Sequence, residues 1–296
     1  MNDRGERVSA GERAVRMPLM QSGNLGIVVP VLAASPGAGA TTVAAALADA
    51  AQIRGCAVLL VDTADGARSG LARAARTEGP ARPGPRPGSR MRYSWRAQAL
   101  LARAETTSAT LNAADLPPPP YWLPPGHRVR ATVVDLASDP WSIATNPAAG
   151  AGAWLAPVGG GTHPIVVVRP SLPGVIHAEQ ILARLEYWGR RGSVALPCRL
   201  VVVGVRKWPA QVAASAGARV QALIPTTVFL PHDSGLAVEG VTASVTPPGL
   251  RDPLKGLLDQ ILGPSPGGPV ETTETRDRSR WRIRRARLDA GEPTPS

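Results

Sequence analysis

An apolar run, a glycine-rich turn and an alanine-rich segment follow one another between residues 26 and 55. Residues 27–32 are apolar throughout, and the turn Ser35-Pro-Gly-Ala-Gly-Ala-Thr-Thr42 comes shortly after them. Residues 42–54 are rich in alanine, and Gly55 is the type of residue that ends a helix. This order predicts a buried strand, a tight loop and a helix.

Further apolar runs have the pattern of parallel strands that are buried on both faces. They cover residues 57–61, 131–135, 165–168, 200–203 and 228–230. Helical spacing of apolar residues occurs over residues 175–188, and a last helix is predicted with Asp252 as its cap and Pro253 in its first turn. We therefore predict an α/β fold, with a doubly wound, mostly parallel sheet and helices on both of its faces.

The composition divides the chain into one domain and two tails. We predict a domain over residues 23–263, a disordered arm over 1–22 and a disordered basic tail over 264–296. Proline and glycine in residues 78–92, and the prolines of residues 117–120, disfavour a helix or an inner strand. Residues 78–130 are accordingly interpreted as a surface excursion that precedes the strand at 131–135.

The net charge of +11 is concentrated in two arginine-rich segments. Nine arginines lie between Arg68 and Arg103 against one acid, and seven lie between Arg276 and Arg287 against one acid. Any polyanionic partner is expected at these segments, and for the second one we expect DNA or an anionic membrane, without sequence specificity. A solvated extension that binds nothing is the alternative for the tail.

Several classes of protein are disfavoured by simple counts. No apolar run approaches the ~20 residues of a membrane helix, so we expect a cytoplasmic protein, with a peripheral position at the inner face of the membrane as an option. Cys56 and Cys198 each begin an apolar run and are predicted to be buried free thiols. Four scattered histidines give no metal spacing and are interpreted as structural or surface residues: His127, His163, His177 and His232.

The turn after the first strand has the outline of a phosphate-binding loop. Such loops wrap phosphate with backbone N–H groups, reach it with a lysine and hold magnesium with a hydroxyl. The candidate nucleotide-binding residues are consecutive: Gly37, Ala38, Gly39, Ala40, Thr41 and Thr42. Ala40 occupies the position of the lysine, so the loop keeps its backbone pattern and lacks its charge.

In an open α/β sheet, ligands bind at the carboxyl ends of the strands, where this loop, Asp62 and Asp135 would meet. At these residues the chain resembles the MinD/ParA family of deviant P-loop ATPases. The resemblance rests on Ser35-Pro-Gly-Ala-Gly-Ala-Thr-Thr42, Val61-Asp62 and Val133-Val-Asp135, and it extends over roughly residues 26–262. It implies a P-loop NTPase fold, ATP with magnesium as cofactor, and Thr41, Asp62 and Asp135 as the residues nearest the metal.

Four positions depart from the family pattern. Ser35 replaces the lysine that reaches the partner's nucleotide, Ala40 replaces the phosphate-binding lysine, Ala64 replaces the second acid of Asp-x-Asp, and Gly204 replaces an adenine-contacting asparagine. The missing lysine at position 40 is also a point of resemblance to the TadZ/CpaE branch of the family, in which that lysine is frequently absent. The chain thus looks like a degenerate member.

The missing charges affect binding and catalysis differently. Losing one charge-assisted contact costs about 1.5–3 kcal/mol, which leaves weak nucleotide binding to the backbone loop. Hydrolysis suffers more, because a cation on the transferring phosphoryl group is worth on the order of 10³–10⁵ in rate. We predict a pseudo-ATPase without catalytic residues, acting as a positioning or scaffold subunit, as a homodimer or in a larger secretion, pilus, conjugation or partition assembly.

Other interpretations stay open from the sequence. The loop can be an ordinary strand-to-helix turn, and Asp62 and Asp135 can merely cap the segments that follow them. An active ATPase would need a substitute cation, for which Arg68 or an arginine of a second subunit is the candidate. A nucleic-acid or membrane tether is a third function. Trp141 and Trp154 flank a Gly/Ala-rich stretch and are interpreted as loop packing in preference to a partner surface.

Overall fold

The computed structural model describes residues 22–107, 110–158 and 161–263. The arm over residues 1–21, the tail from 264 onward and the segment from Arg276 to Arg287 lie outside this part of the chain, so the predictions made for them stay predictions. The helices and strands belong to one compact unit that ends at Leu262.

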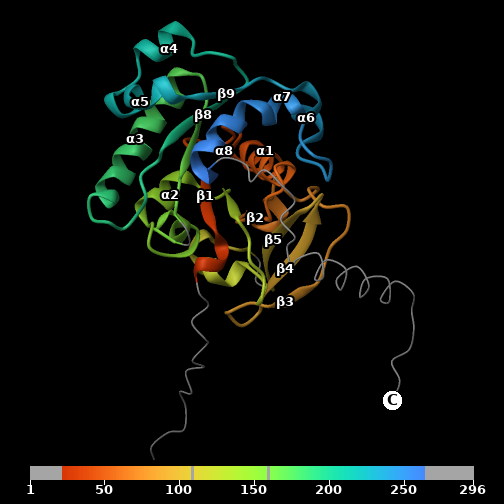
Figure 1. Cartoon of the computed structure of the whole chain (residues 1–296). Coiled ribbons are helices and arrows are strands. Elements are labelled where there is room, and N and C mark those ends of the chain that lie inside the picture. Colours follow the sequence, from red (N-terminus) through yellow and green to blue (C-terminus); the bar gives the residue numbers. More distant parts are fainter. Residues whose placement is uncertain (1–21, 108–109, 159–160, 264–296) are drawn as a thin grey trace, which may run out of the picture. The chain divides into compact units, whose positions relative to one another are not determined.

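A sheet forms the centre of this unit (Figure 1). It has nine strands, in the order β3-β4-β5-β2-β6-β1-β7-β8-β9. The strands are β1 Ile27–Ala33, β2 Val58–Asp62, β3 Ala81–Pro83, β4 Ser89–Arg96, β5 Ala99–Thr106, β6 Ala131–Leu136, β7 Ile165–Val168, β8 Arg199–Val203 and β9 Val228–Leu230. The seven strands from β5 to β9 in this order pair in parallel, whereas β4 runs antiparallel to both β3 and β5. The predicted α/β fold with a mostly parallel sheet is confirmed.

Helices cover both faces of the sheet. They are α1 Ala40–Ile53, α2 Pro140–Thr145, α3 Leu172–Gly189, α4 Ala210–Ala214, α5 Ala218–Leu223, α6 Ser234–Glu239, α7 Pro248–Arg251 and α8 Lys255–Leu262. On one face, α1 and α8 pack with side chains such as Val29, Val31 and Leu60. On the other face, α2 and α3 pack with the alternate residues of the same strands, such as Val28 and Leu59, because successive strand residues point to opposite faces.

The two tryptophans singled out in the sequence have different environments. Trp154 is fully buried and packs edge-on against Trp122, with 6.1 Å between ring centroids, so it belongs to the core. Trp141 on α2 is 47% exposed, and the guanidinium of Arg184 lies 5.3 Å from its ring centroid. Loop and core packing therefore accounts for Trp154 only.

The surface excursion predicted for residues 78–130 is wrong in part. Strands β3, β4 and β5 form an antiparallel extension of the sheet within this range, and β4, with neighbours on both sides, takes in residues 89–92. Pro83 lies in the edge strand β3, where one side needs no ladder hydrogen bonds and a proline is tolerated. The glycines of residues 78–92 all precede Ser89, where β4 begins, so they do not interrupt that strand.

Several arginines between Arg68 and Arg103 form ion pairs within the domain. Four of the nine form ion pairs with carboxylates: Arg86 with Asp115, Arg92 with Glu78 and Glu105, Arg96 with Asp49, and Arg103 with Asp62 and Glu78. The surface near the hairpin is consequently less basic than the sequence suggests. This weakens the expectation of a polyanion partner at residues 68–103.

Two local predictions need correction. Helical structure near the C-terminal end of the domain begins at Pro248, and Asp252 starts a short 3-10 turn and pairs with Lys255 at 2.9 Å instead of capping an α-helix. The apolar face predicted for this segment is buried. Cys56 is a buried free thiol as predicted, whereas Cys198 is a free thiol that is only half-buried.

No helix formed by the described residues is both long enough and apolar enough to span a bilayer.

Candidate nucleotide site

The predicted phosphate loop connects β1 to α1. Gly37 and Gly39 have φ angles of 72° and 99°, a region that side chains with a Cβ rarely adopt, so the glycines permit the tight path of the loop. The Ala38 N–H donates to the Ser35 carbonyl at 3.2 Å, and the first helical bond runs from the Val43 N–H to the Gly39 carbonyl at 3.0 Å.

The first turn of α1 is open to an anion. No side chain caps this helix, since its N-cap is Gly39, and the α1 N-terminus carries no acidic residue in its first turn. The first N–H groups of a helix have no partner within the helix, and the helix dipole makes this end positive. The N–H groups at Ala40, Thr41 and Thr42 are therefore suited to bind phosphate.

Asp62 and Asp135 lie directly opposite one another on β2 and β6, and both are buried. Burial raises the pKa of Asp135 to about 7, the nearby Asp62 carboxylate adds to this rise, and the Thr41 hydroxyl opposes it. The structure thus brings Thr41 to Asp135, as the strand ends predicted. Neither carboxylate oxygen of Asp135 completes a hydrogen bond of ordinary geometry with any described residue.

Asp62 differs from Asp135 because its oxygens are already occupied. One accepts a hydrogen bond from the Ala64 N–H at 3.0 Å, and the other accepts from the Ser69 hydroxyl at 2.5 Å and lies 3.4 Å from Arg103 Nε. Burial still raises the pKa of Asp62, against the lowering effect of these partners. For Asp62 the capping interpretation fits well, and a metal would have to displace existing contacts.

The buried carboxylate of Asp135 fits a magnesium site better. The described residues hold no group of three or more histidine, cysteine or acidic side chains that could bind a metal unaided. Mg²⁺ usually takes one or two carboxylates, water and the phosphates of its substrate. Asp135 with the Thr41 hydroxyl supplies the protein's share of such a site, whereas Asp65 is engaged elsewhere by the N–H groups of Ala67 and Leu111.

The two positions at which the family resemblance predicts lysines, 35 and 40, carry uncharged residues. Ala40 is the first residue of α1 and is 8% exposed, and Ser35 is 8% exposed. Arg68, the substitute cation considered from the sequence, is exposed on the short 3-10 turn Gly66–Arg68. A different arginine contacts the loop: Arg169, just after β7, donates to the Gly37 carbonyl.

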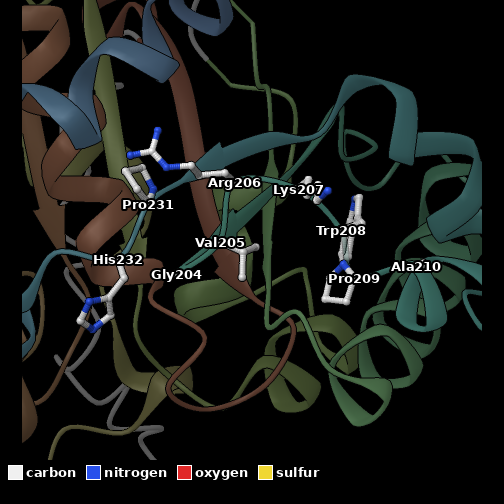
Figure 2. A pocket seen from close by; sticks show the side chains of 9 residues that line it. All are labelled: Gly204, Val205, Arg206, Lys207, Trp208, Pro209, Ala210, Pro231 and His232. Atoms are coloured by element: carbon white, nitrogen blue, oxygen red, sulfur yellow. The ribbon is translucent and has the colours of Figure 1, made fainter.

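A cavity of about 720 Å³ lies at the carboxyl ends of β8 and β9. Its lining runs from Gly204 to Ala210 and includes Pro231 and His232. Figure 2 shows the Trp208 indole and the His232 imidazole at opposite sides of this group. A Cβ on Gly39 would lie 3.2 Å from the side chain of Val203, so the loop packs against the carboxyl end of β8, the strand that leads into the cavity.

The chemistry of the cavity suits an aromatic, anionic ligand. Arg206 and Lys207 contribute two cations, and Trp208 contributes an aromatic ring that packs edge-on against Phe229. No carboxylate is among the residues that line the cavity. His232, interpreted from the sequence as structural or surface, is exposed at this cavity; its place after a predicted strand was the available signal.

Comparisons with known proteins place few constraints on this chain. No protein-family model matches it, and no curated protein matches it. Among solved structures, it is similar to a ParA family ATPase from Chlorobium tepidum TLS, with 16% sequence identity and a TM-score of 0.43. That similarity covers 82% of this chain and 96% of the other.

Proposed function

We propose that this chain binds a purine nucleotide without hydrolysing it. The loop from Gly37 to Thr42 would hold the phosphates, Asp135 with the Thr41 hydroxyl would hold Mg²⁺, and the cavity at Trp208 would take the base. The observation that carries the proposal is the unpartnered, buried Asp135 carboxylate beside Thr41, at the uncapped end of α1. A buried charge without a partner is costly, and a bound cation would compensate it.

The absence of turnover follows from the residues at the loop. Both lysine positions are neutral, at Ser35 and Ala40. A positive group on the transferring phosphoryl is worth on the order of 10³–10⁵ in rate, while the backbone loop and helix end still favour ground-state phosphate binding. Nucleotide binding then serves as a structural signal. We infer a positioning or scaffold subunit that pairs with a second copy or joins a larger assembly.

Restoring the loop charge is expected to strengthen nucleotide binding. Ala40→Lys should tighten ADP binding in the presence of Mg²⁺ by about 10- to 100-fold, the equivalent of one charge-assisted contact. Ala40→Met is the matched control, because it adds a stem of similar length without charge at the same buried position. Calorimetric titration measures both. Equal affinities of the two variants would contradict phosphate binding at this loop.

Hydrolysis is tested with the native protein. We expect phosphate release from ATP with Mg²⁺ to stay at the rate of a no-enzyme control. Sustained release that disappears in Asp135→Ala would establish an active ATPase and overturn the pseudo-enzyme proposal. The Asp135→Ala control is needed because it separates turnover at this site from a contaminating ATPase.

A further inference from the structure

Arg169 lies between the two halves of the candidate nucleotide site. It follows β7 directly, and β7 is the strand between β1, which leads into the loop, and β8, which leads into the cavity. Its Nε and Nη2 atoms donate to the Gly37 carbonyl at 3.2 and 3.1 Å. The carboxyl end of β7 therefore places a guanidinium against the loop, on the side where the cavity begins.

Gly37 leaves the space that this guanidinium uses. A Cβ on Gly37 would come 2.9 Å from Nη2 of Arg169, closer than such atoms approach in practice. Gly37 thus serves two purposes, since its positive φ angle shapes the loop and its missing side chain admits the arginine.

No acid in the described part of the chain forms an ion pair with Arg169. The side chain is exposed. Its acceptor in the structure is the neutral Gly37 carbonyl, although guanidinium groups form stronger and often bidentate hydrogen bonds with phosphate. A nucleotide phosphate on the loop would offer Arg169 a better partner than the one it has.

We propose that Arg169 contacts the nucleotide phosphates and supplies, for ground-state binding, a positive charge that the loop lacks at Ala40. This inference rests on the proposed function, because it requires phosphate on the loop. Arg169 moves its donors from the Gly37 carbonyl to a phosphate oxygen, and no covalent step is involved. The sequence offered a signal for this residue, since Arg169 ends an apolar run as Asp62 and Asp135 do.

The test compares ligands with and without phosphate on the full chain. Titration with adenosine and with ADP plus Mg²⁺ gives the phosphate advantage, defined as the ratio of the two dissociation constants. We expect Arg169→Ala to reduce this ratio by about 10- to 100-fold while adenosine binding stays unchanged. Arg128→Ala is the matched control, because Arg128 is exposed and precedes β6 at the opposite end of the sheet.

A second variant separates charge from loop support. Arg169→Gln keeps an N–H donor for the Gly37 carbonyl and removes the charge, so it should lose the phosphate advantage as Arg169→Ala does. If Arg169→Gln retains the native ratio, the residue only braces the loop and the inference is overturned. If the native chain binds adenosine but gains nothing from phosphate, both this inference and phosphate binding at the loop fail. A loss of the phosphate advantage in the two Arg169 variants, with the native ratio kept in Arg128→Ala, supports the inference.

Discussion

Replacing Arg96 with methionine is expected to lower the free energy of unfolding by about 3–5 kcal/mol, the usual cost of removing one member of a buried ion pair. Arg96 and Asp49 are both fully buried, and the guanidinium donates to the carboxylate at 3.1 and 2.7 Å. It also donates to the carbonyls of Thr242 and Ser244. The variant would leave the Asp49 charge buried without its counter-ion and would release the segment that precedes α7.

Urea unfolding followed by circular dichroism measures this change. Arg90→Met is the control, because Arg90 is exposed on the same strand, β4. The double variant Arg96→Met with Asp49→Leu should recover part of the loss, since replacing both charges by apolar groups removes the unpaired carboxylate. A loss below about 1 kcal/mol for Arg96→Met would show that this network contributes little.

Asp135→Asn is expected to stabilise the metal-free protein at pH 8 by up to about 4 kcal/mol. The pKa of Asp135 rises from 3.8 to about 7 on folding, so the folded state binds this proton more tightly than the unfolded chain. The contribution of the protonated carboxyl to stability is complete below pH 3.8 and is lost as the pH rises through about 7. Asparagine carries no such charge, so the variant loses this dependence.

The measurement is the free energy of unfolding at several pH values between 4 and 8, with chelator present. Asp252→Asn is the control, because the Asp252 side chain is 56% exposed and pairs only at the surface with Lys255. The native protein and the control should lose stability together as the pH rises. Parallel curves for the native protein and Asp135→Asn would contradict the raised pKa. Added Mg²⁺ should stabilise the native protein at pH 8 and not the variant.

Strands that lie between parallel neighbours were predictable from the sequence, and the hairpin strands were not. Strands β2, β6 and β7 are buried on both faces, so their residues form continuous apolar runs. Strand β4 carries arginines at alternate positions, including Arg92, which pairs with Glu105 on the adjacent strand β5, and Arg96, which pairs with Asp49 on α1. Local composition does not contain those pairs, so the segment resembled a basic loop.

The candidate site was likewise predictable only where it depends on the order and direction of the strands. The strand-end rule brought Thr41 and Asp135 together correctly, because it depends only on parallel strands sharing an edge. It did not distinguish Asp135 from Asp62, whose oxygens are taken by Ser69 and Ala64 from the following loop. Side-chain partners of this kind depend on the folded path of the loop and not on motif spacing.

Calorimetric titration of the native full chain with ADP and Mg²⁺ tests the central claim most directly, with phosphate release from ATP measured on the same sample. We expect saturable binding at one site per chain, weaker without Mg²⁺ and weaker in Asp135→Ala, together with no release above background. Saturable binding whose affinity is the same with and without Mg²⁺ and in Asp135→Ala would contradict a nucleotide site at the loop. The absence of any binding would contradict it as well.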